Sequence, residues 1–197
     1  MKILALNCGS SSVKYLFVDT SMGFTPLEGL AMGTRCGDID AAIPLYIMKE
    51  ENIKTDRMNE ILNKKSGLAG ITGGDSDLRI IREKVRQGSD QHILALDIFT
   101  RRVKKYIGSY AAVMGGVDIV VFTASIGENS NLVRSMCCEG LGFLGISIDE
   151  DKNMRDSTCI SNDRTKVLVI PTNEEHAIIQ EVERVLIQED QYVKRTA

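Results

Sequence analysis

The sequence lacks the patterns that mark membrane, secreted and metal-stabilised proteins. Its longest apolar runs, such as VLVI at 167–170, are far too short to span a bilayer. Residues 1–6 hold one lysine and a short apolar run, without the longer apolar stretch and cleavage site of a secretory leader. The five cysteines are odd in number and include no CxxC pair, so neither a zinc site nor a disulfide framework is expected. These absences predict a protein of the reducing cytoplasm with no membrane partner.

Charge and histidine content exclude two further classes. The formal net charge is −3 and no Lys/Arg cluster dominates, so no nucleic-acid partner is expected. The only histidines, His92 and His176, have no obvious Ser, Cys or carboxylate partner, so both are interpreted as structural or exposed. No hydrolase triad is therefore predicted. The adjacent Cys137 and Cys138 are expected to give one buried and one partly exposed thiol on a helix.

What is present favours an α/β domain. The chain has 197 residues, of which 43% are hydrophobic and 26% charged, which is typical of an ordinary globular domain. Strands are predicted at 2–6, 13–18, 118–122, 145–149 and 166–170. Helices are predicted at 38–50, 55–64, 91–114, 130–139 and 173–188. Strands separated by helices indicate an α/β fold with a mixed sheet.

The stretch LNCGSSSVKYLF, residues 5–16, is the first candidate site. Gly9 lets the backbone approach a ligand, and the N–H groups and hydroxyls of the serines at 10–12 can donate to phosphate oxygens. Lys14 adds a positive charge, and Asn7 can offer its amide oxygen to a metal ion or its water. The spacing matches neither a Walker A loop nor a G-x-G-x-x-G turn. A plain β-hairpin with a polar turn is the alternative, because Ser/Gly turns are common.

A second candidate site is GTRCGDID, residues 33–40, where Arg35 stands on a glycine-flanked loop. A guanidinium in this setting can clamp a phosphoryl group and neutralise the charge that builds during its transfer. The alternative is a surface ion pair between Arg35 and a nearby aspartate.

Two more segments follow apolar strands. VVFTASIGENS, residues 120–130, predicts a strand, a small-residue turn and a helix capped by Asn129 or Ser130. A nucleotide would lie at this strand end, as ligands do in open α/β sheets. In IPTNEE, residues 170–175, a Thr-x-x-Glu capping box leaves Glu174 available for Mg²⁺. The alternative for both segments is an ordinary helix N-terminus.

Together, these segments resemble a known family. ILALNCGSSSVK, SMGFTPLEGLAMGTRCGDID, NKKSGLAGI, ALDIFTRRVKKYIGSYAAVMGGVD, VVFTASIGENS and VLVIPTNEE are similar, in this order, to segments of acetate kinases, members of the sugar kinase/Hsp70/actin superfamily. The resemblance implies a ribonuclease-H-like (actin-like ATPase) domain, Mg²⁺ as cofactor, and transfer of phosphate from ATP to acetate or another short carboxylate, giving ADP and acetyl phosphate. It also implies a homodimer formed through this domain.

The resemblance assigns a role to each candidate residue. Asn7 and Glu174 would bind Mg²⁺, and Arg35 would stabilise the transition state. The phosphates of ATP would contact Gly9, Ser10, Ser11, Ser12 and Lys14. The adenosine pocket would be lined by Asp77, Leu78, Arg79, Ser125, Ile126, Gly127, Glu128 and Asn129. The family usually has glycine where this chain has Ser125, whose hydroxyl would crowd the nucleotide.

The chain departs from the family in one large respect. In family members a long stretch precedes SMGFTPLEG, whereas here VDT (18–20) runs directly into SMG. That stretch carries the substrate-binding arginine, the catalytic aspartate, the transition-state histidine and a second phosphate loop, none of which is found here. The opening hairpin, 1–20, is hypothesised to replace the lost one and complete a domain with 21–190, giving one merged domain, 1–190, before a frayed tail at 191–197. A non-catalytic nucleotide-binding remnant, or a subunit that pairs with a fuller chain, is the alternative function.

Overall fold

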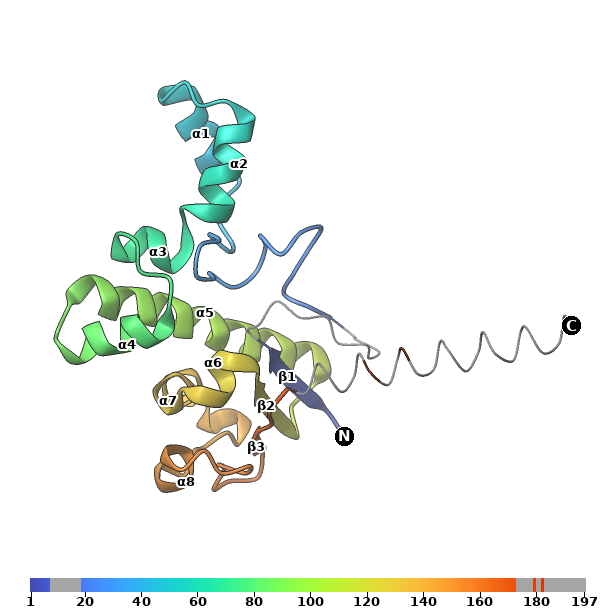
Figure 1. The fold of residues 1–197 in the computed structure, drawn as a ribbon. Helices are drawn as coiled ribbons and strands as arrows, with labels where there is room; N and C mark the ends of the chain where they lie inside the picture. The colour runs from blue at the N-terminus through green and yellow to red at the C-terminus, as the bar shows by residue number, and fades with distance from the viewer. Residues whose placement is uncertain (8–18, 173–178, 180–181, 183–197) are drawn as a thin grey trace, which may run out of the picture.

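A computed structural model describes residues 1–7, 19–172, 179 and 182, and it is an assembly of helices around a small sheet (Figure 1). The strands are β1 (Ile3–Asn7), β2 (Ile119–Thr123) and β3 (Lys166–Val169). The helices are α1 (Ala42–Glu50), α2 (Thr55–Lys64), α3 (Gly67–Thr72), α4 (Leu78–Arg86), α5 (Asp90–Met114), α6 (Ala124–Asn129), α7 (Asn131–Cys138), the 3₁₀ turn η1 (Gly142–Leu144) and α8 (Glu150–Met154). The predicted α/β class is confirmed.

The three strands form a parallel sheet in the order β1-β2-β3. Asn7 pairs with Thr123, and Phe122 pairs with Val169, so the carboxyl ends of all three strands lie at one edge of the sheet. The central β2 is buried on the face of Val120 and Phe122. The strands predicted at 2–6, 118–122 and 166–170 are confirmed within a residue or so, and the strand predicted at 13–18 lies outside the described residues.

The strand predicted at 145–149 is wrong. Gly145 adopts a left-handed conformation (φ 72°) that ends the η1 turn, and only Ile148 pairs there, through an isolated antiparallel bridge to Ser161. A second isolated bridge joins Cys159 to Leu168. Antiparallel pairing in the described part of the chain is limited to these two bridges, so its strands do not themselves form the predicted mixed sheet.

The long helix α5 packs against β1 and contributes much of the core. Its buried face includes Leu96, Phe99, Val103 and Ile107, which recur at steps of three and four and join the core. Gly115 ends it in the left-handed conformation (φ 66°), as predicted from the sequence. Helices α3, α4 and α7 pack against α5, so this helix connects the sheet to the segments that carry the candidate site.

The prediction for the adjacent cysteines is half wrong. Cys137 and Cys138 are both buried, because α7 packs between α5 on one side and α8 on another. Burial raises the pKa of the Cys138 thiol to about 12. Two neighbouring helices therefore cover a part of α7 that sequence reasoning assigned partly to solvent.

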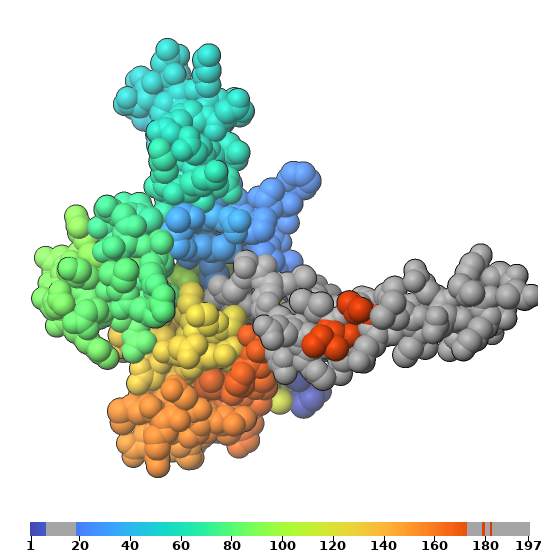
Figure 2. Space-filling view, in the orientation of Figure 1, coloured from blue at the N-terminus to red at the C-terminus, as the bar shows by residue number. Residues whose placement is uncertain are grey.

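Helices α1 and α2 project from the rest of the molecule as a lobe (Figure 2). The predicted helix 55–64 is confirmed, and the one predicted at 38–50 begins at Ala42. No residue of α1 is buried, and its apolar side chains Ile43, Leu45 and Tyr46 are exposed. Among the described residues, no helix has both the length and the apolar character needed to cross a membrane.

Candidate functional site

Strands β1, β2 and β3, each of which precedes one of the predicted segments in the sequence, end at one edge of the parallel sheet. β1 ends at Asn7, β2 at Thr123 and β3 at Val169, three residues before Thr172. The side chain of Asn7, the serine turn with Gly9, Ser10, Ser11, Ser12 and Lys14, and also Glu174 and His176, lie outside the described residues. Their roles therefore stay predictions, while the segments next to them are well defined.

The segment after β2 is a helix, not the turn predicted there. β2 passes directly into α6 at Ala124, whose backbone has a positive φ of 59°, a conformation that L-residues seldom adopt. A Cβ at Gly127 would lie 3.2 Å from the backbone of Phe122, a tighter contact than most Cβ atoms make, so glycine lets α6 fold back closely onto the strand without displacing it. Ser125 is exposed and Ile126 is half-buried at the sheet edge. As predicted, Ser130 caps the following helix, accepting a hydrogen bond from the N–H of Val133.

Glu128 connects α6 to the end of β3. Its Oε1 accepts a hydrogen bond of 2.8 Å from the backbone N–H of Thr172 and one of 3.0 Å from the Thr172 hydroxyl. The two residues are 44 positions apart in the sequence. The side chain predicted to line the adenosine pocket is thus used to hold two elements together at the sheet edge.

The segment GDSDLR forms the start of α4. Asp77 caps this helix by accepting a hydrogen bond of 2.8 Å from the N–H of Arg79, and it also pairs with the Arg79 guanidinium at 2.6 Å. These hydrogen bonds lower the pKa of Asp77 to about 2. Leu78 is buried in the core, whereas Arg79 is exposed.

Arg82, one turn further along α4, joins the two segments predicted to form the adenosine pocket. Its Nη1 donates a hydrogen bond of 3.0 Å to the carbonyl oxygen of Asn129 at the end of α6. The structure therefore brings residues 77–79 and 125–129 to neighbouring positions, although Arg82 and Asn129 are 47 positions apart in the sequence.

Arg35 lies on a loop that backbone hydrogen bonds fix rigidly. The N–H groups of Leu68 and Ala69, in α3, donate to the carbonyls of Met32 and Gly33, both at 2.9 Å. A Cβ at Gly67 would lie 2.1 Å from the carbonyl oxygen of Met32, so this close approach requires glycine. Among the described residues Arg35 forms no ion pair, and its guanidinium donates to the sulfur of Met32 at 3.7 Å. The surface Arg–Asp pair offered as an alternative is not found among them.

A depression of about 620 Å³ opens beside Arg35. Lys64 and Asn63 from α2, the loop residue Thr34 and also Ser76 contribute to its walls. Since Ser76 directly precedes Asp77, the Arg35 loop and the start of α4 lie side by side. The cavity holds two cationic side chains next to the segment predicted to bind the nucleotide.

Asp38 anchors this loop to α5. It accepts hydrogen bonds from the N–H of Gly29 (2.8 Å) and the hydroxyl of Tyr106 (2.8 Å), and it pairs with Arg102 at 2.7 Å. Burial opposes ionisation of Asp38, but the hydrogen bonds from Tyr106, Gly29 and Arg102 outweigh it and hold its pKa below the usual value. The Arg35 loop is therefore held from both sides, by α3 and by α5.

The interpretation of His92 needs a correction. It is buried, as a structural histidine is, but it has both a serine and a carboxylate partner. Its Nδ1 lies 2.7 Å from the Ser89 hydroxyl and its Nε2 lies 3.0 Å from Asp75. Asp75 is 17 positions away in the sequence, so no local pattern shows this contact. The ring ties the loop before Asp77 to the start of α5.

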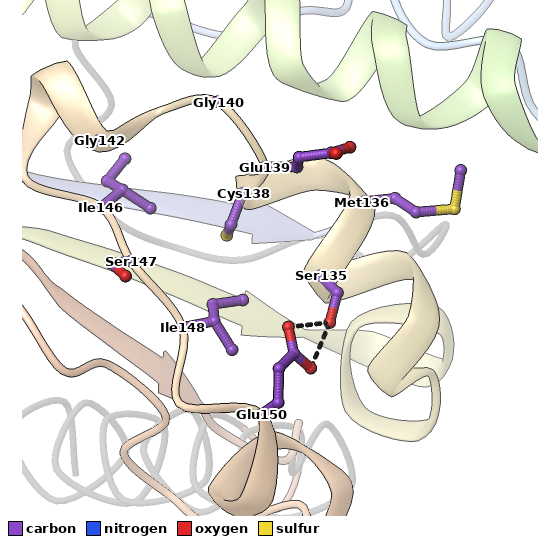
Figure 3. Close-up of a pocket in the computed structure, with 10 residues that line it drawn as sticks. All are labelled: Ser135, Met136, Cys138, Glu139, Gly140, Gly142, Ile146, Ser147, Ile148 and Glu150. Atoms are coloured by element: carbon purple, nitrogen blue, oxygen red, sulfur yellow. Dashed lines mark hydrogen bonds between the residues drawn. The ribbon is translucent and has the colours of Figure 1, made fainter.

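A second depression, of about 570 Å³, lies between α7 and α8 (Figure 3). Ser135 and Glu150 face one another across it, with the Ser135 hydroxyl donating to both carboxylate oxygens. It contains none of the predicted site residues. In the described part of the chain, no group of three or more His, Cys, Asp or Glu side chains is placed to hold a metal ion.

Most of this chain is similar in sequence and in structure to proteins of one known family. A model of the Acetokinase family matches residues 16–180. The chain is 52% identical over 195 residues to an acetate kinase of Alkaliphilus metalliredigens, covering 94% of this chain and 49% of that protein. The crystal structure of Porphyromonas gingivalis acetate kinase is similar with a TM-score of 0.81 at 40% identity, over 84% of this chain and 43% of that one. A propionate kinase from Francisella tularensis matches with a TM-score of 0.77 at 42% identity, over 80% and 41% of the two chains.

These comparisons confirm the resemblance and the fold, which is that of the actin-like ATPases. The chain spans about half the length of the curated relatives that it matches. Residues 1–15, which include the predicted phosphate turn, lie outside the family match. The chain belongs to the acetokinase family.

Proposed function

We propose that this chain is the nucleotide-binding part of an acetate-kinase-like phosphotransferase, which transfers the terminal phosphate of ATP to acetate or another short carboxylate. The products would be ADP and an acyl phosphate, acetyl phosphate when acetate is the acceptor. Relatives named as an acetate kinase and a propionate kinase both match, so the proposal covers short carboxylates as a class.

One observation carries the proposal: a series of contacts links all the described segments predicted to bind ATP. The Arg35 loop packs beside Ser76 and the start of α4, Arg82 joins α4 to α6, and Glu128 joins α6 to Thr172. This series ends at the carboxyl edge of a parallel sheet, where α/β proteins bind nucleotides. Each segment could be stable without these contacts to the others, so the contacts support a shared role in binding.

The expected Mg²⁺ fits the chemistry of the predicted donors. Asn7 ends β1, whose carboxyl end lies beside those of β2 and β3, and Glu174 comes five residues after β3 in the sequence. Amide and carboxylate oxygens are ligands that Mg²⁺ accepts, and it usually keeps several waters besides them. We therefore propose that Asn7 and Glu174 hold Mg²⁺, which would neutralise charge on the phosphates.

Phosphoryl transfer depends on positioning and charge stabilisation on both sides of the moving group. Arg35 stands on a loop held by backbone hydrogen bonds, has no carboxylate partner among the described residues, and is suited to stabilise the charge of the transferring phosphoryl group. The acceptor-side residues of the family have no counterpart in this chain. Because loss of one such group costs on the order of 10²–10³ in rate, we expect very low turnover from this chain alone.

Calorimetry with Mg²⁺ and ATP tests nucleotide binding, and an acetyl phosphate assay tests transfer. Saturable binding of ATP that requires Mg²⁺, with little or no acetyl phosphate formed, is the expected result. Turnover comparable to ordinary kinases would refute the predicted loss of the acceptor side. Absence of any nucleotide binding by a cooperatively folded chain would refute the proposed function itself.

The alternative is a non-catalytic subunit that binds nucleotide and pairs with a fuller chain or with a second copy. Exposed apolar side chains on α1, among them Ile43, Leu45 and Tyr46, offer surface for such pairing. Sedimentation of the isolated chain tests the predicted homodimer. Acetyl phosphate formation that appears only after a full-length relative is added would favour the alternative.

A further inference from the structure

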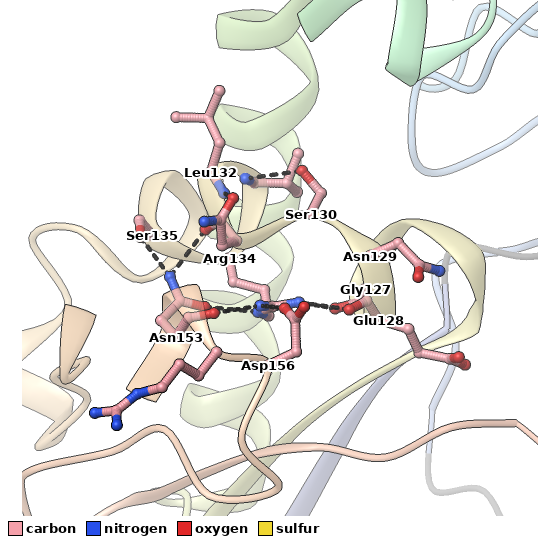
Figure 4. Close-up of polar contacts among 12 residues, drawn as sticks. Gly127, Glu128, Asn129, Ser130, Leu132, Arg134, Ser135, Asn153 and Asp156 are labelled. Atoms are coloured by element: carbon pink, nitrogen blue, oxygen red, sulfur yellow. Dashed lines mark hydrogen bonds and ion pairs between the residues drawn. The ribbon is translucent and has the colours of Figure 1, made fainter. Parts of the chain in front are cut away.

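Arg134 on α7 is buried without any exposed surface, and it is the largest fully buried side chain among the described residues. Sequence reasoning assigned it no role. Its guanidinium lies between α6 and α8, where Figure 4 shows it directed at the backbone of α6 on one side and at Asn153 and Asp156 on the other. A cation in this position is costly to bury unless its hydrogen bonds are satisfied.

The N–H groups of Arg134 are distributed over two helix ends. Nη1 donates to the carbonyl oxygens of Gly127 and Glu128, both at 2.8 Å. Nε donates to the side chain of Asn153 at 2.7 Å, and Nη2 donates to the Asn153 carbonyl at 2.9 Å and also pairs with Asp156. Only a planar guanidinium has enough donors, in a fixed fork, to serve both ends at once.

Helix α6 depends on these contacts. Its last carbonyls have no intrahelical donor, and the residue after it, Ser130, is not in the left-handed conformation that commonly caps a helix end. Arg134 takes two of these carbonyls, and Arg82 takes the carbonyl of Asn129. The carbonyl end of α6 is thus held by two arginines from other helices.

Burying the Arg134 guanidinium costs desolvation free energy that an apolar core residue would not cost. Among the described residues, the only anion paired with the Arg134 guanidinium is Asp156, whose side chain is half-exposed. The other groups that accept hydrogen bonds from Arg134 are neutral. Apolar residues of similar volume often stabilise a core as well as a buried ion pair does. What they cannot do is fix the carbonyl groups of α6 in one geometry.

We propose that Arg134 is the positioning residue of the nucleotide site, which holds α6 so that residues 125–129 are preorganised for the adenosine part of ATP. The inference rests on the proposed function, because it assumes that α6 lies against the nucleotide. Arg134 touches no ligand itself and acts through the backbone of Gly127 and Glu128.

The test compares Arg134→Lys with Arg155→Met, a control that removes an exposed guanidinium from the same α8 region. Lysine keeps the charge but has too few donors for both helix ends. Binding of Mg·ADP and of Mg²⁺ with inorganic tripolyphosphate is measured by calorimetry, and hydrogen exchange of the α6 amides is measured without ligand. We expect Arg134→Lys to lower the affinity for Mg·ADP on the order of tenfold, because the variant loses hydrogen bonds from a charged donor. The affinity for tripolyphosphate should stay unchanged, and hydrogen exchange of the α6 amides should become faster. Arg155→Met should match the parent.

Each outcome decides the inference. Equal ADP affinity in Arg134→Lys and the parent overturns it, and so does a loss of the same size for ADP and tripolyphosphate, which would indicate general loosening. If Arg134→Lys does not fold, Asp156→Ala, which removes one half-exposed partner, takes its place with the same criteria. If the parent binds no nucleotide, the proposed function fails and the inference, which rests on it, is overturned with it. Equal ADP affinity of the variant and of a parent that does bind nucleotide overturns the inference alone.

Discussion

The Arg82 guanidinium donates a hydrogen bond of 3.0 Å to the carbonyl oxygen of Asn129, and this contact joins α4 to α6. Both helices carry residues that the family resemblance assigns to the adenosine pocket. The bond is partly exposed, so its contribution to the stability of the whole chain is small, while its effect on the relative position of the two helices is direct.

Replacement of Arg82 by methionine should therefore weaken Mg·ATP binding more than it weakens the fold. We expect roughly a fivefold loss of affinity, equivalent to about 1 kcal/mol, with the urea midpoint nearly unchanged. Arg86→Met is the matched control, since Arg86 lies one turn further along α4 and pairs only with Glu83 among the described residues. Equal affinities for the two variants would contradict the positioning role of Arg82.

Gly67 should be among the glycines least tolerant of substitution. Its φ of 61° strains any L-residue, and a Cβ would also collide with the carbonyl of Met32. Gly67→Ala is expected to lower the free energy of unfolding by at least about 2 kcal/mol, because a backbone clash adds to the conformational strain.

Gly73→Ala is the control for that substitution, because φ there is 82° and nothing lies within 4 Å of the place that an added methyl group would take. Its cost should be about 1 kcal/mol, the conformational strain alone. Urea unfolding of both variants gives the difference, and equal costs would show that the loop carrying Arg35 shifts away from α3 without penalty.

Asp77 should contribute to acid sensitivity. Its hydrogen bonds to Arg79 lower its pKa from 3.8 to about 2, so its stabilising contribution is complete above about pH 4 and is lost as pH falls toward 2. Asp77→Asn keeps a good helix cap but has no charge to titrate. The urea midpoint of this variant should therefore fall less than that of the parent between pH 4 and pH 2.

The partner of Asp77 provides the comparison. Arg79→Met removes the guanidinium that lowers the pKa of Asp77, so the urea midpoint of this variant should also fall less than that of the parent between pH 4 and pH 2. If Asp77→Asn and the parent lose stability in parallel below pH 4, the link between Asp77 and Arg79 does not control acid unfolding.

Tyr106→Phe should loosen the loop that carries Arg35. The hydroxyl donates to Asp38, a charged acceptor, and its removal is expected to cost about 1 kcal/mol of unfolding free energy. Tyr46→Phe, on the exposed surface of α1, should be neutral. Urea unfolding measures both, and an equally neutral Tyr106→Phe would show that Arg102 and Gly29 alone anchor Asp38.

Much of the fold follows from local patterns. The steps of three and four in α5, the glycine that ends it, and the short apolar runs of β1, β2 and β3 are set by neighbouring residues, so the sequence predicts them. Helices α3, α6 and α8 were not predicted, because they have only five or six residues and carry too few turns for a periodic pattern to emerge. Helix α4 was also not predicted, although its nine residues equal the length of α1. Local chemistry pointed to the serine turn, the Arg35 loop and the ends of two strands as candidate sites, whereas residues 77–79 were assigned only through the family resemblance.

Local sequence patterns and family resemblance thus account for the α/β class, the long helix α5, the three described strands and the relationship to acetate kinases. Packing settled what they left open: Arg134 is buried, His92 faces Asp75, and Cys137 and Cys138 are both covered. Arg134 and His92 each have a partner 17 or more positions away in the sequence. The two cysteines are covered by helices that sequence periodicity does not place, so only the packed chain reveals these surroundings.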